Sequence, residues 1–316
     1  MPAQKRILVT GATGFLGREI VAAGAQKGHH MVAVSRAGTK VAGSNEQQAC
    51  GDLAQGVSAI QLAGIDAVIH CAALVHQPAA PAAAYTPMNV DLPLALAKTA
   101  REAGAKIFVQ ISSVAAIASQ TVPGAVLDDS ATPRPSTPYG ASKLAADEAL
   151  SGLVAPEFAI VSLRPPAIYG PGVGAPFSQL MKAARMGLPA PLGSIRSLRS
   201  FAYVGNIADA AICVAGAKPA LVQSGSFLVT DSLPITPASF YSNLTWKHGH
   251  KGRVWNVPSG LVEPLARLAL RRRADSLLTS AAFNGERFMR TFNWRPDLSI
   301  EDALDSWVFE ERRQIE

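Results

Sequence analysis

The first half of the chain alternates short apolar runs with longer segments of helical spacing. Apolar runs that end in turn residues are typical of buried parallel strands, because helices cover both faces of such strands. The predicted strands are Arg6–Thr10, Met31–Val34, a short one near Ala49, Ala67–Cys71, Lys106–Ile111 and Ala159–Leu163. The predicted helices between them include Phe15–Lys27, Leu92–Glu102 and Tyr139–Leu153. This order predicts an α/β fold with a doubly wound parallel sheet, whose ligands bind beyond the carboxyl ends of the strands.

Three glycines separate the first predicted strand from the first predicted helix, with the spacing G-x-x-G-x-x-G. Glycine lets the chain turn sharply and lets its backbone approach a ligand closely. The N-terminus of the following helix offers N–H groups and a partial positive charge to a pyrophosphate. The segment therefore predicts a dinucleotide site on a Rossmann-type sheet. The predicted contacts in this loop are Gly11, Thr13, Gly14, Phe15, Leu16 and Gly17.

The residues after the second predicted strand bear on which dinucleotide is bound. Folds that bind NAD usually place an acidic residue there, which holds the ribose 2′-hydroxyl. This chain has Ser35 and Arg36 instead. An arginine can pair with a 2′-phosphate, whereas a carboxylate would repel it. The sequence thus favours NADP(H) as the cofactor, with NAD(H) as the alternative if Arg36 is solvated or stacks on adenine.

Composition and cysteine spacing argue against a disordered, a disulfide-linked, a metal-binding and a membrane-spanning protein. With 316 residues, of which 48% are hydrophobic and 16% charged, the chain is expected to be globular, with one or two domains. Neither the widely spaced cysteines (Cys50, Cys71 and Cys213) nor the six histidines predict a metal site or a disulfide. No signal peptide is visible, and prolines interrupt the apolar stretch 71–90. We therefore expect a cytoplasmic protein without a membrane helix.

The net charge of +6 suits an anionic nucleotide substrate. The strongest basic cluster is Arg271-Arg272-Arg273, which follows an apolar segment. Cations at the end of a helix complement its dipole, so we interpret the cluster as a helix C-terminus. The other interpretation is a basic amphipathic segment that touches a membrane or nucleic acid.

The candidate chemistry lies in Ser113, Tyr139 and Lys143. Tyr139 and Lys143 are four residues apart on one face of a predicted helix, where the ammonium favours the phenolate and should lower the tyrosine pKa. Ser113 follows a predicted strand, and its hydroxyl can hydrogen-bond the same substrate oxygen. Such a tyrosine can give or take a proton while hydride moves to or from a nicotinamide. A surface tyrosine beside a solvated lysine is the other interpretation.

Taken together, these motifs resemble the extended branch of the short-chain dehydrogenase/reductase superfamily, over nearly the whole chain. Further segments that carry the resemblance are Gly51–Leu53, His70–Ala73, Asn89–Asp91, Leu163–Gly172, Arg199–Asp209 and Asn293–Pro296. The resemblance implies cofactor contacts at Ser35, Arg36, Asp52, Leu53, Cys71, Ala72, Ala73, Asn89, Ile111, Tyr139, Lys143, Pro166 and Ile168. It also implies a dinucleotide-binding domain at 1–170, rejoined by a segment around 200–230, a smaller substrate-binding subdomain in most of 171–316, and a homodimer.

Within this branch the chain is most similar to bacterial UDP-sugar 4-epimerases and 4-keto reductases. That similarity implies a nucleotide-linked sugar as the substrate, with Arg199 on the diphosphate. The implied substrate contacts are His76, Ser113, Phe177, Leu192 and Arg199. One residue departs from the pattern, because Pro176 stands where the family commonly has an asparagine that contacts the diphosphate.

The sequence narrows the reaction. A dehydratase of this branch would carry an Asp-Glu pair directly after Ser113, where this chain has Val114 and Ala115. Since a net reductase draws on NADPH, Arg36 favours hydride transfer at C4 by a 4-keto reductase. The alternatives are an NAD-dependent 4-epimerase, a reductase or dehydrogenase of a non-sugar carbonyl or steroid-like alcohol, and a non-catalytic NADP sensor.

Overall fold

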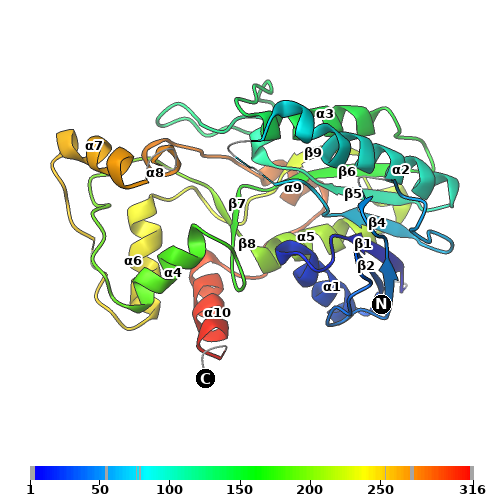
Figure 1. The fold of residues 1–316 in the computed structure, drawn as a ribbon, viewed down its shortest axis with the longest axis horizontal. Helices are drawn as coiled ribbons and strands as arrows, with labels where there is room; N and C mark the ends of the chain where they lie inside the picture. The colour runs from blue at the N-terminus through cyan, green and yellow to red at the C-terminus, as the bar shows by residue number, and fades with distance from the viewer. Residues whose placement is uncertain are drawn as a thin grey trace.

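The computed structural model describes residues 4–53, 56–75, 77, 80–252, 254–270 and 274–313. A parallel sheet with helices on both faces forms one side of the molecule, and a smaller group of helices forms the other (Figure 1). His76 and the arginine cluster at 271–273 lie outside the described residues, so what was predicted for them stays a prediction.

In the described part of the chain, the main sheet has seven parallel strands in the order β3-β2-β1-β4-β5-β6-β9, and β7 and β8 form a separate pair. The strands are β1 (Arg6–Thr10), β2 (His30–Ser35), β3 (Glu46–Ala49), β4 (Ala67–His70), β5 (Ile107–Ile111), β6 (Ala159–Arg164), β7 (Ala167–Tyr169), β8 (Phe201–Tyr203) and β9 (Gly225–Leu228). The chain winds outward from β1 first through β2 and then through β4. This order confirms the predicted α/β class and the doubly wound parallel sheet.

Helices cover both faces of the sheet, with α1 and α5 on one face and α2 and α3 on the other (Figure 1). These four are α1 (Phe15–Gln26), α2 (Leu92–Glu102), α3 (Pro138–Ser151) and α5 (Val204–Gly216). The remaining α-helices are α4 (Phe177–Arg185), α6 (Pro237–Lys247), α7 (Ser259–Leu270), α8 (Asp275–Leu278), α9 (Glu286–Thr291) and α10 (Ile300–Arg313). Short helical turns are η2 (Ala82–Ala84), η3 (Pro87–Asp91), η4 (Val114–Ala116) and η5 (Pro219–Leu221).

The central strand β1 supplies side chains to two buried cores. Ile7 and Val9 pack with residues of α1 and α5 on one face of the sheet, among them Ile20. Leu8 packs on the other face with residues of α2, among them Leu96. Because successive side chains of a strand point to opposite faces, the continuous apolar run of β1 serves both cores.

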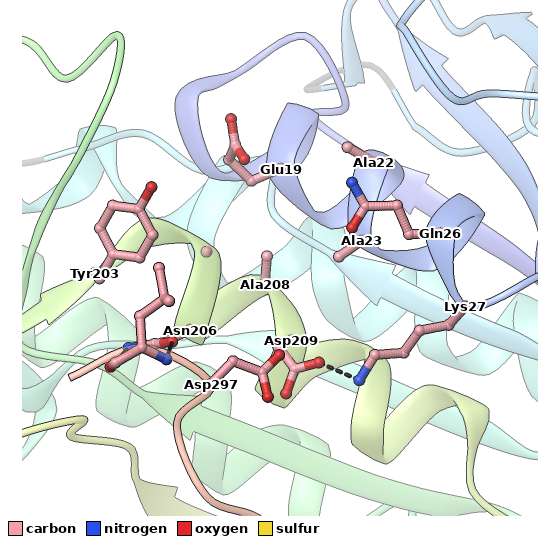
Figure 2. Close-up of a pocket in the computed structure, with 12 residues that line it drawn as sticks. Glu19, Ala22, Ala23, Gln26, Lys27, Tyr203, Asn206, Ala208, Asp209 and Asp297 are labelled. Atoms are coloured by element: carbon pink, nitrogen blue, oxygen red, sulfur yellow. Dashed lines mark hydrogen bonds and ion pairs between the residues drawn. The ribbon is translucent and has the colours of Figure 1, made fainter. Parts of the chain in front are cut away.

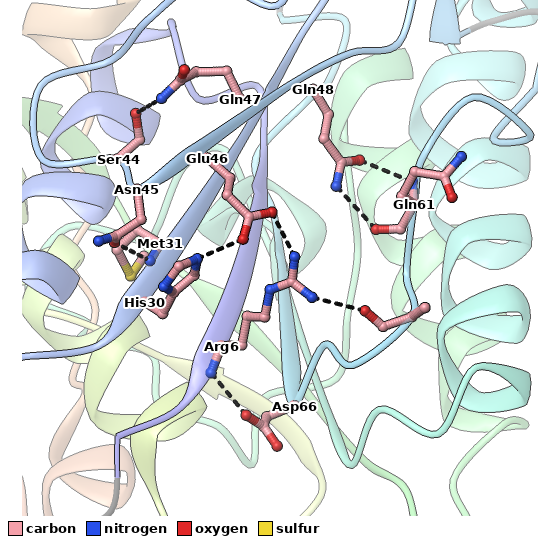
Figure 3. A network of polar contacts seen from close by, with 11 residues as sticks. Arg6, His30, Met31, Ser44, Asn45, Glu46, Gln47, Gln48, Gln61 and Asp66 are labelled. Atoms are coloured by element: carbon pink, nitrogen blue, oxygen red, sulfur yellow. Dashed lines mark hydrogen bonds and ion pairs between the residues drawn. The ribbon is translucent and has the colours of Figure 1, made fainter.

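A polar network ties the amino ends of the strands together (Figure 3). The backbone N–H of Arg6 donates to Asp66 Oδ2 at 2.8 Å, and its guanidinium pairs with Glu46 at 2.5 Å. His30 Nε2 lies 2.7 Å from the same carboxylate. Hydrogen bonds from Arg6 and His30 lower the pKa of Glu46. The network therefore lies at the end of the sheet opposite the glycine loop, because β1 begins at Arg6 and ends at Thr10, just before that loop.

The later part of the chain returns to the sheet. Within residues 200–230, α5 packs against α1 and β9 pairs with β6 at the edge of the sheet. β7 and β8 pair with each other where the chain leaves the sheet for the smaller group of helices (Figure 1). The division into two domains stays a prediction. No helix in the described ranges combines the length and apolar character needed to cross a bilayer.

Candidate active site

The glycine loop joins β1 to α1 and is shaped by close backbone contacts. Gly11 has a φ of +66°, and a Cβ there would lie 2.8 Å from the backbone nitrogen of Ala72. A Cβ on Gly17 would lie 2.2 Å from the carbonyl oxygen of Gly11. Gly14 is the N-cap of α1, so Phe15 and Leu16 begin the helix. Positions 11 and 17 therefore need glycine. The N-terminus of α1, which follows the loop, fits a pyrophosphate.

The segments predicted to border the adenine ribose lie side by side after β2 and β3. Ser35 is buried, and its Oγ accepts a hydrogen bond from Thr39 N at 2.9 Å. Arg36 is exposed, and its carbonyl accepts from Gly51 N at 3.1 Å. The hydrogen bond between Gly51 and Arg36 brings the segment of Asp52 and Leu53 beside Arg36. This arrangement fits the prediction that both segments contact one cofactor.

Asn89, predicted at the cofactor, forms internal hydrogen bonds that the sequence did not predict. It is buried in η3, and its amide hydrogen-bonds both backbone groups of Leu74 and the hydroxyl of Ser142 at 3.0 Å. The residue therefore holds the segment after Cys71–Ala73 against α3.

Burial raises the pKa of the Cys71 thiol to about 12, so the thiol stays protonated at neutral pH.

Ser113, Tyr139 and Lys143 lie together at the carboxyl end of β5. Ser113 caps η4, and a side-chain hydrogen bond joins it to Tyr139, near the start of α3. One helical turn later, Lys143 is buried and its Nζ donates to the carbonyl of Ile111 at 2.9 Å. The same Nζ lies 6.0 Å from the centroid of the Tyr139 ring. The structure thus brings all three predicted catalytic side chains and Ile111 to one place.

The expected lowering of the Tyr139 pKa is wrong. Burial raises the pKa of Tyr139 to about 12, against a smaller lowering by its hydrogen bond with Ser113. Burial lowers the pKa of Lys143 to about 8, and the carboxylate of Asp147 acts against that shift. Loss of solvation on burial is the largest effect on the pKa of the phenol, while the ammonium of Lys143 donates to the Ile111 carbonyl.

Asp147 and Arg164 form a buried ion pair next to Lys143, which the sequence pattern did not predict. Asp147 Oδ2 accepts from Arg164 Nε at 2.8 Å and from the hydroxyl of Ser112 at 2.9 Å. Asp147 follows Lys143 by one helical turn on the buried face of α3. The signal that could have found it is this spacing, because an acidic residue four positions after a buried lysine faces the same way.

Three of the predicted substrate contacts line one cavity of about 530 Å³. They are Phe177 on α4, Leu192, and Arg199 just before β8. Pro166, predicted at the cofactor, lies just before β7, and Ile168, also predicted there, lies within it; between them Ala167 reaches the same cavity. The structure therefore brings Phe177, Leu192 and Arg199 together at one cavity, whose described lining does not include Pro166 or Ile168. His76 lies outside the described residues.

A second, more polar groove lies between α1 and α5 (Figure 2). There Asp209 forms an ion pair with Lys27 and accepts a hydrogen bond from Trp294 Nε1 at 2.7 Å. None of the three predicted catalytic residues lines this groove. Asp209 and Trp294, both in segments that carried the family resemblance, thus hold helices together.

Among the described residues, no group of three His, Cys, Asp or Glu side chains could hold a metal ion.

The chain matches the sequence profile of the NAD dependent epimerase/dehydratase family over residues 7–229. A UDP-glucose 4-epimerase of Vibrio cholerae is 32% identical over 250 residues, which cover 76% of this chain and 75% of that protein. A 4-hydroxy-2-methyl-3-oxo-4-farnesyl-3,4-dihydroquinoline-1-oxide ketoreductase of Stigmatella aurantiaca is 29% identical, covering 80% of this chain and 76% of that protein.

Solved structures share the fold at low identity. A UDP-N-acetylglucosamine 4-epimerase from Bacillus cereus has a TM-score of 0.80 at 19% identity, covering 98% of this chain and 100% of its own. A human epimerase family protein with NADPH has a TM-score of 0.76 at 22% identity, covering 96% and 99%. A UDP-glucuronic acid 4-epimerase from Bacillus cereus with NAD has a TM-score of 0.73 at 18% identity, covering 98% and 100%. Since the family profile spans more than half of its length, this chain belongs to the NAD dependent epimerase/dehydratase family.

Proposed function

We propose that this NAD(P)-dependent enzyme reduces a carbonyl group to a secondary alcohol, with Tyr139 as the proton donor. The observation that carries the proposal is the juxtaposition of Ser113, Tyr139 and Lys143 at the carboxyl end of β5. β5 is the second strand from β1, which ends at the glycine loop. Arg36 and the absence of a carboxylate at the end of β2 favour NADP(H) over NAD(H). A homodimer and a cytoplasmic location remain predictions from the sequence.

The nicotinamide, when bound, supplies the hydride that reaches the carbonyl carbon. Ser113 donates a hydrogen bond to the carbonyl oxygen and positions it. Tyr139 gives the proton of its Oη–H bond to that oxygen, which becomes the alcohol hydroxyl. The charge of Lys143 stabilises the phenolate that results. A tyrosine pKa of about 12 keeps the phenol protonated at neutral pH, as a proton donor requires.

The first candidate substrate is a 4-keto nucleotide sugar, as the sequence predicts. The UDP-glucose 4-epimerase relative and the position of Arg199 in the cavity support it. An NAD-dependent 4-epimerase would use the same three residues in both directions. The second candidate is a ketone that carries an apolar group. It is favoured by the apolar lining of the cavity and by the ketoreductase relative, whose name specifies a farnesyl substituent.

Replacement of the proton donor tests the proposal. Tyr139→Phe should lower turnover by about 100-fold or more, because general acid catalysis typically contributes that much. NADPH oxidation is followed with 4-keto-6-deoxy UDP-glucose and with a series of methyl ketones, and NADP⁺ affinity is measured by fluorescence. Retained affinity with lost turnover supports the proposal. Unchanged turnover removes Tyr139 from the mechanism, and a wild type that binds dinucleotide but reduces none of these carbonyls is a sensor.

A further inference from the structure

The cavity between α4, α6 and β8 has an almost wholly apolar wall. Its two polar members are Gln179 and Arg199. The apolar members are Ala167, Pro176, Phe177, Leu180, Ala183, Leu192, Phe201, Pro237, Phe240 and Leu277. Its volume of about 530 Å³ is in the usual range for a small-molecule site.

Aromatic rings give part of this wall a fixed shape. The rings of Phe201 and Phe240 lie 4.7 Å apart, and those of Phe177 and Phe201 lie 5.8 Å apart. Phe201 and Phe240 are buried, whereas Phe177 and Leu180 on α4 stay half-buried. The half-buried side chains leave apolar surface facing the cavity, which an apolar ligand would cover.

The same wall offers little to a diphosphate. The N–H groups of Ser178, Gln179 and Leu180 in the first turn of α4 already donate to the carbonyls of Gly174 and Pro176. Pro176 carries no side-chain donor where the family commonly has an asparagine.

Arg199 is the only cation among the described residues that line the cavity, and its Nη1 donates to the carbonyl of Thr279 at 2.9 Å. Burial lowers the pKa of its guanidinium. One cation on an otherwise apolar wall compensates poorly for the two charges of a buried diphosphate.

One residue of the cavity wall, Ala167, is joined through the chain to the segment of Ser113. Ala167, the first residue of β7, lines the cavity. Two residues before it, the carbonyl of Pro165 accepts a hydrogen bond at 3.1 Å from the N–H of Val114, the neighbour of Ser113. β7 and β8 lie between the sheet and the helices α4 and α6 (Figure 1). A substrate whose carbonyl meets Ser113 and Tyr139 can therefore extend along β7 into the cavity.

We infer that this cavity binds an alkyl, acyl or aromatic group of the carbonyl substrate, so that the substrate class is a ketone with an apolar chain. The inference rests on the proposed carbonyl reduction and selects the second of its candidate substrates. Phe177, Leu180 and Ala183 on α4 set how long that chain can be.

Two readouts test the assignment, one of binding and one of turnover. The uncharged fluorescent probe N-phenylnaphthylamine is titrated into the wild type and into Ala183→Trp, which fills the cavity, with UDP as a competitor. Turnover with NADPH is measured on methyl ketones of increasing chain length. Leu221→Trp is the matched control, because Leu221 is 71% exposed and does not line the cavity. Leu180→Gln, a change of similar volume, serves if the tryptophan variant does not fold.

We expect the wild type and Leu221→Trp to bind the probe equally and without displacement by UDP. Ala183→Trp should bind it at least tenfold more weakly, and Leu180→Gln several-fold more weakly. The KM for methyl ketones should fall about fourfold per added methylene in the wild type, and this dependence should disappear in Ala183→Trp.

Displacement of the probe by UDP, or equal probe binding by Ala183→Trp, would overturn the inference. Reduction of a 4-keto UDP-sugar without probe binding would do the same and leave the proposed function standing. Probe binding as expected, with no carbonyl reduced, would support the apolar site and reject the proposed reaction.

Discussion

Arg36 is the residue on which the proposal of NADP(H) as the cofactor rests. It is exposed directly after β2, where a carboxylate would hold an NAD ribose. We expect Arg36→Ala to weaken NADP⁺ binding about tenfold to hundredfold, the usual worth of hydrogen bonds to a charged group, and to leave NAD⁺ binding nearly unchanged. Side-by-side fluorescence titrations measure both. Equal losses for the two dinucleotides would instead place Arg36 on the adenine, and tighter NAD⁺ binding by the wild type would favour the epimerase.

Lys143 gives the protein a stability that rises with pH. Burial lowers its pKa from 10.5 to about 8 in the folded protein. Between these values the unfolded chain binds the additional proton, so the free energy of unfolding increases as the pH rises. Tyr139, with its pKa raised from 10.0 to about 12, acts in the opposite direction above pH 10.

Urea unfolding of the wild type and of Lys143→Met separates this contribution from the rest of the protein. The wild type should gain stability relative to the variant between pH 8 and pH 10, the window set by the two pKa shifts. A difference that stays flat or falls across this window would show that Lys143 keeps an ordinary pKa in the folded protein.

The sequence could predict that Ser113, Tyr139 and Lys143 form one candidate site, but it could not predict their pKa shifts. Ser113, Tyr139 and Lys143 followed from residue type, order and a spacing of one helical turn. The direction of the Tyr139 pKa depends on how deeply the phenol is packed and on the Ile111 carbonyl, which takes the lysine. Both come from tertiary contacts that no local pattern carries.

The buried face of α3 connects the reactive residues to the core of the sheet. Lys143 and Asp147 both lie on that face, and Asp147 pairs there with Arg164 of β6. Asp147→Asn should destabilise the protein by about 3–5 kcal/mol, because it leaves a buried guanidinium without its partner. The neighbouring Glu148→Gln on the exposed face is the matched control. Equal free energies of unfolding in urea for the two variants would contradict the role given to the pair.

Elements with a strong periodic pattern were predictable, and short or distant ones were not. α2 spans Leu92–Glu102 as predicted, and α1 ends at Gln26, one residue before the predicted end. β7 and β8 have three residues each, too few for a period to show. β9 is a strand because β6 offers it a parallel edge, and this pairing joins segments far apart in the sequence.

At the scale of the whole molecule, the sheet carries the candidate active site and the smaller group of helices supplies most of the cavity wall. The sequence could name Phe177, Leu192 and Arg199 as substrate contacts because their segments resemble a family pattern. It could not show the character of the cavity, since the wall combines side chains from α4, β8, α6 and the segment before α9. Only the assembled structure shows that apolar side chains dominate there.

The central claim is that this protein delivers hydride to a carbonyl carbon. The most direct test uses NADPH deuterated at the transferable position of the nicotinamide, with a long-chain methyl ketone and a 4-keto UDP-sugar as separate substrates. We predict deuterium on the alcohol carbon of the product, detected by mass spectrometry, from the wild type and almost none from Tyr139→Phe. A protein that binds NADPH but yields no deuterated alcohol from either substrate would contradict the account.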